Sequence, residues 1–484
     1  MTRPLAVTLA LELASSEREA LEATPVLANT RARASRYVST YFDTADHAVC
    51  KSGHTLCIRH AGGVSVQSIQ SDIGLVSDLV SRPVWERVID SERPELRGED
   101  ELIAHLRDAR LIKLFAIEVD LTVRTVTWKG ASLTCDIATH SIHTGRRRHT
   151  LSTISFALQD GPQTALFGLA RHLADLLPLR LAVASPAEHG YRSLASTEPG
   201  SCKAEAIPLA ADDSAEAALQ LIIRSGMRQF RLNETELIRN GAPEALHQAR
   251  VGLRRMRTAF SLHRDMLGRD EPAAVLTAGL KRLAGTLGTV RDLDVLLAAS
   301  PRAQRTPIAD ARQVSFLSAR AEIDSPATRT VMIALAEWLT TGHWRTASAD
   351  PPAGRLTVCE SAEAILERAH RKLKRRGRNL GSLDDDARHA VRIAAKKLRY
   401  ALDFFSAVYA HGKRQRRRET LSAALSELQD RLGTLNDRVN RPRLLTKLGI
   451  AQASPHAART SRKHLLRLAE KAFAAFRAAI RCWR

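Results

Sequence analysis

A row of basic side chains that could hold a polyanion occurs twice in the sequence. The first copy is His247-Gln-Ala-Arg-Val-Gly-Leu-Arg-Arg-Met-Arg257, with basic residues 3, 7, 8 and 10 positions after its histidine. The second copy, His389-Ala-Val-Arg-Ile-Ala-Ala-Lys-Lys-Leu-Arg399, repeats that spacing. At 3.6 residues per turn, the positions at 0, 3, 7 and 10 form one stripe along a helix. Neither copy contains an acid, so a bound anion is the simplest way to neutralise each stripe.

A second motif follows each stripe and predicts an internal duplication. Leu287-Gly-Thr-Val-Arg-Asp292 begins 40 residues after His247, and Leu432-Gly-Thr-Leu-Asn-Asp437 begins 43 residues after His389. Two shared motifs in the same order indicate a repeated helical unit. Arg291 of the first unit is replaced by Asn436 in the second. We therefore do not expect the two halves to bind a ligand equally.

Long helices must position these stripes, and the sequence after residue 213 has helical periodicity almost to its end. Asp213 or Ser214 could cap the first helix, and breaks are expected at Pro243, Gly268, Pro301, Pro307, the loop 350–354 and Gly381. The expected helices are 214–238, 243–267, 272–299, 309–323, 326–341, 358–376, 386–409, 415–447 and 460–481.

The first 200 residues alternate polar and apolar side chains over many short runs, which is typical of strands. Turns containing glycine separate several of them. The expected strands are 6–14, 37–42, 54–60, 64–69, 84–88, 116–127, 132–138 and 151–158, with helices at 17–27 and 166–177. This pattern predicts an antiparallel barrel or sheet, and the whole chain is predicted to be an α+β protein.

The excess of positive over negative charge lies entirely in the helical part of the chain. The net charge is +21, yet residues 1–200 carry 22 basic and 23 acidic residues, and the remaining 284 carry 51 and 29. A field of that sign attracts nucleic acid, polyphosphate or an anionic membrane surface.

The cysteines and the apolar runs bear on the location of the protein. The six cysteines are scattered without a Cys-x-x-Cys pair, which suits a reducing cytosol and argues against a zinc ribbon. No signal peptide and no apolar run near 18 residues is evident. We expect a cytoplasmic protein, with polyphosphate granules as a candidate location.

The helical part resembles the CHAD domain, the conserved histidine α-helical domain, because both stripes and both Leu-Gly-Thr motifs are present. The resemblance covers at least residues 213–447. It implies two four-helix bundles related by a pseudo-twofold axis, with a central basic groove or pore that binds inorganic polyphosphate. The residues implied to bind polyphosphate are His247, Arg250, Arg254, Arg255, Arg257, Lys281, Arg282, Arg291, His389, Arg392, Lys396, Lys397, Arg399 and Tyr400.

Two roles stay open for the histidines at the start of the stripes. His247 and His389 could be buried imidazoles bonded to a helix backbone, or to Asp292 and Asp437, or they could donate to phosphate. We expect the two aspartates to orient arginines and not to bind metal. Two further basic clusters, 372–378 and 413–418, are expected to lie in solvent and to widen the positive rim.

The first 195 residues resemble a CYTH domain, as in the triphosphate tunnel metalloenzymes. The motifs that carry this resemblance are Tyr41-Phe-Asp-Thr44, Leu56-Cys-Ile-Arg59, Trp85-Glu86 and Ser185-Pro-Ala-Glu-His-Gly-Tyr191. That family implies a closed antiparallel barrel in which acids hold divalent metal and basic residues hold phosphates.

The chain departs from the CYTH pattern at most positions that would do chemistry. The Glu-x-Glu-x-Lys motif is replaced by Ala6, Thr8 and Ala10, and the acidic late strand reads Thr153, Ser155 and Ala157. An expected lysine is Gln70, the basic strand before Trp128 offers Asp120 and Thr122, and Arg59 alone is kept. We expect a catalytically inactive domain with no catalytic residue, no metal and no cofactor.

The expected organisation is a CYTH-like domain at 1–195, a linker at 196–212 and a CHAD domain at 213–484. The expected function is polyphosphate binding, because aromatic residues are only 4% of the chain and single-strand nucleic-acid binding relies on stacking. The alternatives are a metal-dependent triphosphatase or polyphosphatase in the barrel, and a non-specific nucleic-acid-binding module. Oligomeric state, chain-length preference and protein partners are not predicted.

Overall fold

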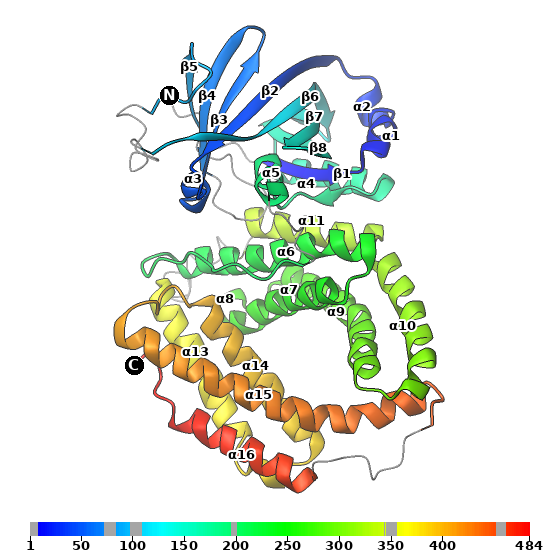
Figure 1. Ribbon diagram of the computed structural model, residues 1–484, viewed down its shortest axis with the longest axis vertical. Helices are drawn as coiled ribbons and strands as arrows, with labels where there is room; N and C mark the ends of the chain where they lie inside the picture. The colour runs from blue at the N-terminus through cyan, green and yellow to red at the C-terminus, as the bar shows by residue number, and fades with distance from the viewer. Residues whose placement is uncertain are drawn as a thin grey trace. The chain divides into compact units, whose positions relative to one another are not determined.

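The computed structural model describes residues 8–71, 84–96, 109–194, 201–342, 344, 356–451 and 461–484. The chain divides into two compact units (Figure 1). Unit 1 comprises Met1–Cys202, Arg231–Ile238 and Glu322–Gly342, and unit 2 comprises Lys203–Phe230, Arg239–Ala321 and His343–Arg484. The domain boundaries drawn from the sequence stay a prediction. That prediction did not anticipate the grouping of residues 231–238 and 322–342 with unit 1.

Unit 1 is built on one antiparallel sheet of nine strands in the order β5-β4-β3-β2-β6-β7-β8-β1-β9. The strands are β1 (Thr8–Leu13), β2 (Ala32–Asp43), β3 (His54–Ala61), β4 (Val64–Ser71), β5 (Val84–Ile89), β6 (Ile112–Trp128), β7 (Ala131–Thr144), β8 (Arg147–Asp160) and β9 (Arg180–Leu181). The predicted antiparallel architecture is confirmed. Within the described residues, no pairing joins the two end strands, β5 and β9.

Two helices pack together beside this sheet within unit 1. They are α4 (Gln163–Leu176) and α11 (Pro326–Thr341), and Nε of Arg329 on α11 donates to the carbonyl of Ala174 at 2.9 Å. The helix expected at 17–27 is broken into a 3-10 turn (Ser15–Glu17), α1 (Arg18–Glu22) and α2 (Pro25–Ala28). Pro25 explains the break, because the residue before a proline is disfavoured in the helical conformation.

The Asp43 carboxylate is fully buried and organises the turn after β2. Its Oδ1 accepts from the backbone N–H groups of Thr44 at 2.7 Å and Val49 at 2.8 Å, and its Oδ2 accepts from that of Cys50 at 3.0 Å. These bonds satisfy the free N–H groups at the start of α3 (Ala48–Lys51). The hydroxyl of Tyr191, on α5 (Pro186–Leu194), also donates to Oδ2 at 2.9 Å. Asp43 therefore ties three segments of the fold together.

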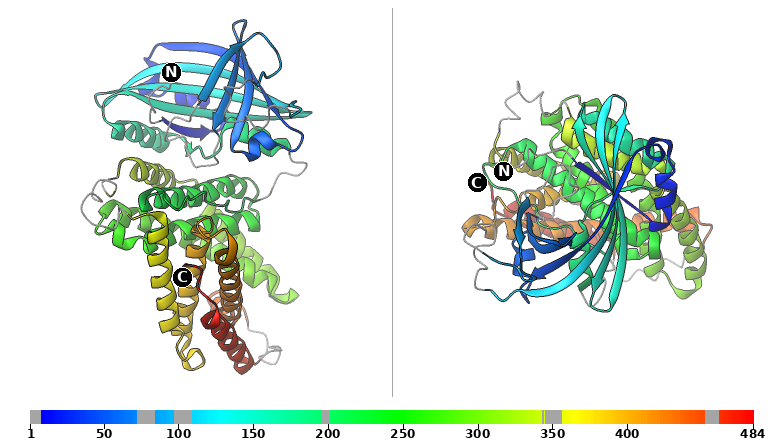
Figure 2. Two further views of the ribbon diagram at one scale, coloured as in Figure 1. Left: turned by 90° about the vertical axis from the view of Figure 1, so that its left-hand side faces the viewer. Right: turned by 90° about the horizontal axis from the view of Figure 1, so that it is seen from above.

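Unit 2 is helical in its described part, and Figures 1 and 2 show its helices from three sides. The long helices that contribute to it are α6 (Ala215–Asn240), α7 (Pro243–Leu262), α9 (Glu271–Ala298), α10 (Arg302–Ile323), α13 (Val358–Arg376), α14 (Asp385–Phe404), α15 (Gly412–Lys447) and α16 (Arg462–Ala478). The short α8 (Arg264–Leu267) follows α7. The expected α+β class is confirmed.

The break expected at Pro307 is wrong. Helix α10 begins at Arg302 and continues through Pro307. A proline this close to the start of a helix removes a single backbone hydrogen bond, and the rest of the helix compensates for that loss. Pro442 also lies inside a helix, near the C-terminal end of α15.

The two repeats pack as equivalent helix pairs. Helix α7 packs against α9, and α14 packs against α15. Helix α7 also contacts α14, while α13 and α16 pack against α14 and α15 respectively. The two predicted stripes therefore lie on helices that touch. In the part of the chain that the structure describes, no helix combines the length and apolar character needed to cross a bilayer.

Candidate functional site

The stripes on α7 and α14 meet where these helices contact. We call this the stripe site and define it as His247, Arg250, Arg254, Arg257, His389, Arg392, Lys396 and Arg399. The clearest link between the helices is a hydrogen bond from Nε of Arg254 to the Tyr400 hydroxyl at 2.7 Å. The guanidinium carbons of Arg254 and Arg399 lie 5.8 and 5.9 Å from the centre of the Tyr400 ring. Tyr400 is buried and positions both arginines.

Arg250 is anchored by the Leu-Gly-Thr motif of the same repeat. Its Nη1 donates to the backbone carbonyls of Leu287 at 3.1 Å and Gly288 at 2.7 Å, and lies 3.9 Å from Oδ1 of Asp292. A Cβ on Gly288 would be 3.7 Å from the guanidinium, so this glycine lies directly beside it. The expectation that Asp292 orients an arginine is met only by a long contact, and the two carbonyls hold Arg250 more closely.

Arg392 occupies the equivalent place in the second repeat with a different set of contacts. A Cβ on Gly433 would lie 3.9 Å from its Nε. This Nε is buried and has no hydrogen-bond partner among the described residues. Burial lowers the pKa of Arg392, whereas the Asp437 carboxylate opposes that shift. The sequence missed the role of Gly288 and Gly433, although their repeated motif was the signal that could have revealed it.

Lys396 is the most strongly perturbed member of the stripe site. Burial, followed by the nearby charges of Arg392, Arg254, Arg399 and Arg250, lowers the pKa of its ammonium group to about 7. Two of these arginines belong to α7 and two to α14. The fields of both repeats therefore converge on one amine.

The histidines differ from each other in their contacts. His389 is exposed, and its Nδ1 lies 2.9 Å from Oδ1 of Asn436 on α15, so its partner is not Asp437. His247 is partly buried, and burial together with Arg291 lowers the pKa of its imidazole. Arg291 of the first repeat is replaced by Asn436 in the second. Each one therefore acts on the histidine of its own repeat.

Some predicted site residues lie away from the stripes. Arg255 is buried, pairs with the Asp403 carboxylate and has its guanidinium carbon 5.0 Å from the centre of the Phe404 ring, so it joins α7 to α14. Lys397 follows Lys396 and is turned about 100° from it around α14. Its Nζ donates to Oγ of Ser261 at 2.6 Å. Lys281 and Arg282 are exposed on α9, and Arg291 lies partly buried near His247.

A cavity opens in unit 1, in the domain that the sequence predicted to be an inactive CYTH-like barrel. It has a volume of about 220 Å³ and is lined by Ala10, Tyr37, Leu121, Asp136, Ala138, His140, Thr153, Ser155 and residues 182–186. No lysine or arginine lines it. Burial raises the pKa of Asp136, and burial lowers the pKa of His140 to about 4. Both groups are thereby driven toward their neutral forms.

The structure tests which residues face this cavity. Ala10, Thr153 and Ser155 line it as expected, whereas Ala6 lies outside the described residues. Leu121 lines it, so its neighbours Asp120 and Thr122 project from the opposite face of β6. The prediction that Asp120 and Thr122 occupy the inner face was therefore wrong by one position along β6.

The side chains on that opposite face are paired. Asp120 pairs with Arg36 at 3.1 Å, and Arg18 donates to Thr122 at 3.0 Å. Gln70 belongs to β4, opposite Thr55. Arg59, the retained arginine, lies on the face of the sheet that carries the cavity-lining Tyr37: its guanidinium carbon is 5.8 Å from the centre of the Tyr37 ring, and it pairs with Glu86 at 3.2 Å. Among the described residues, no three His, Cys, Asp or Glu side chains gather as a metal site would require.

The comparisons with known proteins address the two parts of the chain separately. The CHAD domain family matches residues 221–446. The solved CHAD domain of the plant Ricinus communis is 28% identical, with 58% of this chain and 93% of that chain covered and a TM-score of 0.45. No curated protein matches the chain.

Two further solved structures match a smaller share of the chain. A candidate adenylyl cyclase from Hippeastrum with a dominant triphosphatase activity is 17% identical, with 39% of this chain and 96% of that chain covered and a TM-score of 0.30. A candidate adenylate cyclase from Bacillus halodurans is 11% identical, with 36% and 92% covered and a TM-score of 0.25. The chain thus contains a CHAD domain at residues 221–446 and an N-terminal domain built on one antiparallel sheet.

Proposed function

We propose that this protein binds inorganic polyphosphate at the stripe site and that its N-terminal domain is catalytically inactive. The CHAD domain and the CYTH-like domain support the broader role, which is the handling of a phosphate-rich polyanion. Binding would use charge-assisted hydrogen bonds from several guanidinium groups to successive phosphates.

The convergence of both repeats on Lys396 carries this proposal. Burial, and then the charges of four arginines from two helices, lower the pKa of this half-buried amine. Like charges held this close destabilise each other unless an anion lies among them. The terminal nitrogens of Arg254 also have no hydrogen-bond partner among the described residues, since only its Nε is bonded. Such donors are available to a phosphate oxygen.

The aromatic side chains favour polyphosphate over single-stranded nucleic acid. Tyr400 is the aromatic residue beside the stripes, and its ring is already faced by Arg254 and Arg399. It is also only 6% exposed. A buried ring covered in this way offers no surface on which a base could stack, and stacking supplies much of single-strand affinity.

The apolar inner face of the sheet supports the absence of catalysis. Phe115, Ile117, Val119, Ala138 and Ile142 form a buried cluster, and partly buried Tyr37 and Tyr41 pack against it. Transfer of a triphosphate group needs cations or metal beside the phosphates. The protein should therefore release no phosphate from triphosphate or polyphosphate in the presence of Mg²⁺ or Mn²⁺. Metal-dependent phosphate release would overturn this part of the proposal.

The binding part is tested by calorimetric titration of the full-length protein with long-chain polyphosphate. We expect Arg254→Ala/Lys396→Ala to weaken binding at least about tenfold, because charged hydrogen bonds contribute about 1.5–3 kcal/mol each. The matched control is Lys463→Ala/Arg467→Ala, which removes the same two residue types from exposed positions on α16. Equal losses in both variants would refute the proposed site. Preference for duplex DNA at matched phosphate and salt would favour the nucleic-acid alternative.

A further inference from the structure

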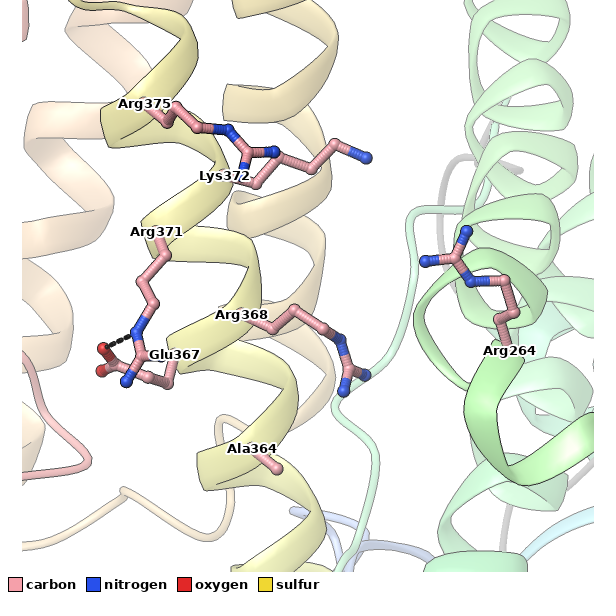
Figure 3. A pocket seen from close by; sticks show the side chains of 7 residues that line it. All are labelled: Arg264, Ala364, Glu367, Arg368, Arg371, Lys372 and Arg375. Atoms are coloured by element: carbon pink, nitrogen blue, oxygen red, sulfur yellow. Dashed lines mark hydrogen bonds and ion pairs between the residues drawn. The ribbon is translucent and has the colours of Figure 1, made fainter.

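A basic cavity lies in unit 2 between α8 and α13 (Figure 3). We call it the α13 pocket. It has a volume of about 570 Å³ and is lined by Arg264, Ala364, Glu367, Arg368, Arg371, Lys372 and Arg375. Five of these seven residues are cations and one is an acid. From the sequence, the cluster at 372–378 was expected to lie in solvent, and the contribution of Arg264 and Arg368 was not foreseen.

The single acid of the pocket is already neutralised by other groups. Oε1 of Glu367 accepts from Nε of Arg371 at 2.8 Å, and its Oε2 accepts from Nη1 of Arg481 and Nε1 of Trp483, both at 3.0 Å. Burial opposes its ionisation, yet these hydrogen bonds and the nearby arginines lower the pKa of the carboxyl group to about 2. Glu367 therefore stays ionised but has little charge left to offset the remaining cations.

The remaining cations face the cavity from two sides. Arg368 donates to the carbonyl of Leu262 at 3.0 Å and pairs with Asp265 at 2.8 Å. In Figure 3 its guanidinium and that of Arg264 reach into the space between the two helices from opposite sides. Lys372 and Arg375 have no side-chain partner among the described residues, and burial and neighbouring arginines lower the pKa of Lys372. The pocket thus has cations on opposing walls and two with unused donors.

Lys397 connects the α13 pocket to the stripe site. Burial and then the charges of Lys372, Arg264, Arg376 and Arg257 lower the pKa of its ammonium group. Lys372 and Arg264 line the pocket, while Arg257 belongs to the stripe on α7. Its Nζ also donates to Oγ of Ser261, which lies between Arg257 of the stripe and Arg264 of the pocket in the sequence, so Lys397 lies between the two sites.

We propose that the α13 pocket binds a run of phosphates from the same polyphosphate chain that occupies the stripe site, with Arg257 and Lys397 between the two. This inference rests on the proposed function. A compact cavity lined by opposing guanidinium groups suits tetrahedral phosphates, which accept forked hydrogen bonds from several directions. It offers no aromatic platform for a base.

The test compares two double variants of the full-length protein that differ in position but not in charge. Lys372→Ala/Arg375→Ala removes the two pocket cations without structural partners. Lys374→Ala/Arg378→Ala removes one lysine and one arginine from exposed positions of the same segment. The dissociation constant for long-chain polyphosphate is measured over a series of salt concentrations. Circular dichroism melting of each variant checks that it folds.

We expect the pocket variant to lose affinity about tenfold and its salt slope to fall by about two, roughly one for each contact that no longer releases a counterion. The exposed variant should keep the wild-type slope, because its charges act only through a screened field. Identical slopes in the two variants would overturn the proposal, as would a reduced slope for duplex DNA but not for polyphosphate.

The stripe variant Arg254→Ala/Lys396→Ala separates the two possible failures. If it loses binding while the pocket variant equals its control, polyphosphate occupies the stripe site alone and only the pocket inference fails. If the stripe variant binds like the wild type, the proposed function fails and the pocket inference fails with it.

Discussion

The two halves of the CHAD domain share a motif but use it differently. In the first half, two backbone carbonyls hold Arg250 in a defined orientation. In the second half, Arg392 lies beside the equivalent glycine, but its buried Nε has no partner among the described residues. Preorganised donors lose less conformational freedom on binding and so contribute more to affinity. The first half should therefore dominate ligand binding.

The flanking residues reinforce this asymmetry. Counted from the shared Leu-Gly-Thr motif, Lys281, Arg282 and Arg291 correspond to Ser426, Glu427 and Asn436 in the second half. The second half thus loses three cations and gains an acid along the same helix. Duplication preserved the stripe, while its surroundings diverged.

The strongest test of this comparison exchanges each of the two equivalent arginines, Arg250 and Arg392, for lysine. Arg250→Lys keeps the charge but removes the guanidinium Nη1 that donates to two carbonyls, so we expect polyphosphate affinity to fall about tenfold. Arg392→Lys should weaken binding only about twofold to threefold, because that arginine has no comparable anchor to lose. Isothermal titration of both variants decides the point. Equal losses would mean that the anchoring carbonyls do not matter.

Lys396 joins the halves and should make binding depend on pH. Its pKa of about 7 means that the free amine loses its proton as the pH rises through neutrality, while a bound polyanion favours the protonated form. Affinity should therefore fall about tenfold between pH 6 and pH 8. Lys396→Arg stays charged and should flatten this profile. An unchanged profile in that variant would assign the titration to another group.

Asn436 offers a way to make the halves more alike. Asn436→Arg restores the residue found in the first half, and we expect affinity to rise about threefold and the salt slope to increase by about one. Arg291→Asn should have the opposite effect in the first half. Fluorescence competition against labelled polyphosphate would measure both. A loss of affinity in Asn436→Arg would show that the His389–Asn436 contact matters more than the added charge.

Gly288→Ala should have the smallest effect on binding. The added Cβ would meet the Arg250 guanidinium at 3.7 Å, which is ordinary van der Waals contact. Replacing a glycine inside a helix by alanine stabilises the fold by about 0.5–1 kcal/mol. We therefore expect a higher melting temperature with unchanged polyphosphate affinity. A marked loss of affinity would mean that Arg250 needs more room than the free structure provides.

The sequence was most informative where periodicity and composition agree. Nearly all the long helices were predicted within a few residues, because their apolar positions recur at helical spacing. The strands β6, β7 and β8 are longer than predicted, since their ends at Ile112, Thr144 and Arg147 extend beyond the apolar alternation. Strand register also escaped prediction, and Asp120 shows how a shift of one residue reverses the face.

The site was predicted as a set of residues, but its internal organisation was not. Arg255 and Lys397 follow stripe residues directly in the sequence, yet a rotation of 100° per residue turns them toward other partners. The sequence also gave no indication that Arg264 and α13 would enclose a cavity, because they lie about a hundred residues apart. Contacts of that range depend on tertiary packing and have no local pattern.

The buried Asp43 carboxylate bears on how such proteins are classified. It belongs to Tyr41-Phe-Asp-Thr44, one of the motifs that carry the resemblance to a CYTH domain, and its hydrogen bonds to the described residues are all made to groups of the fold itself. Selection for folding alone would preserve a residue with that many internal bonds. The motif can therefore be kept for folding whether or not the domain is an enzyme, and its presence alone does not indicate activity.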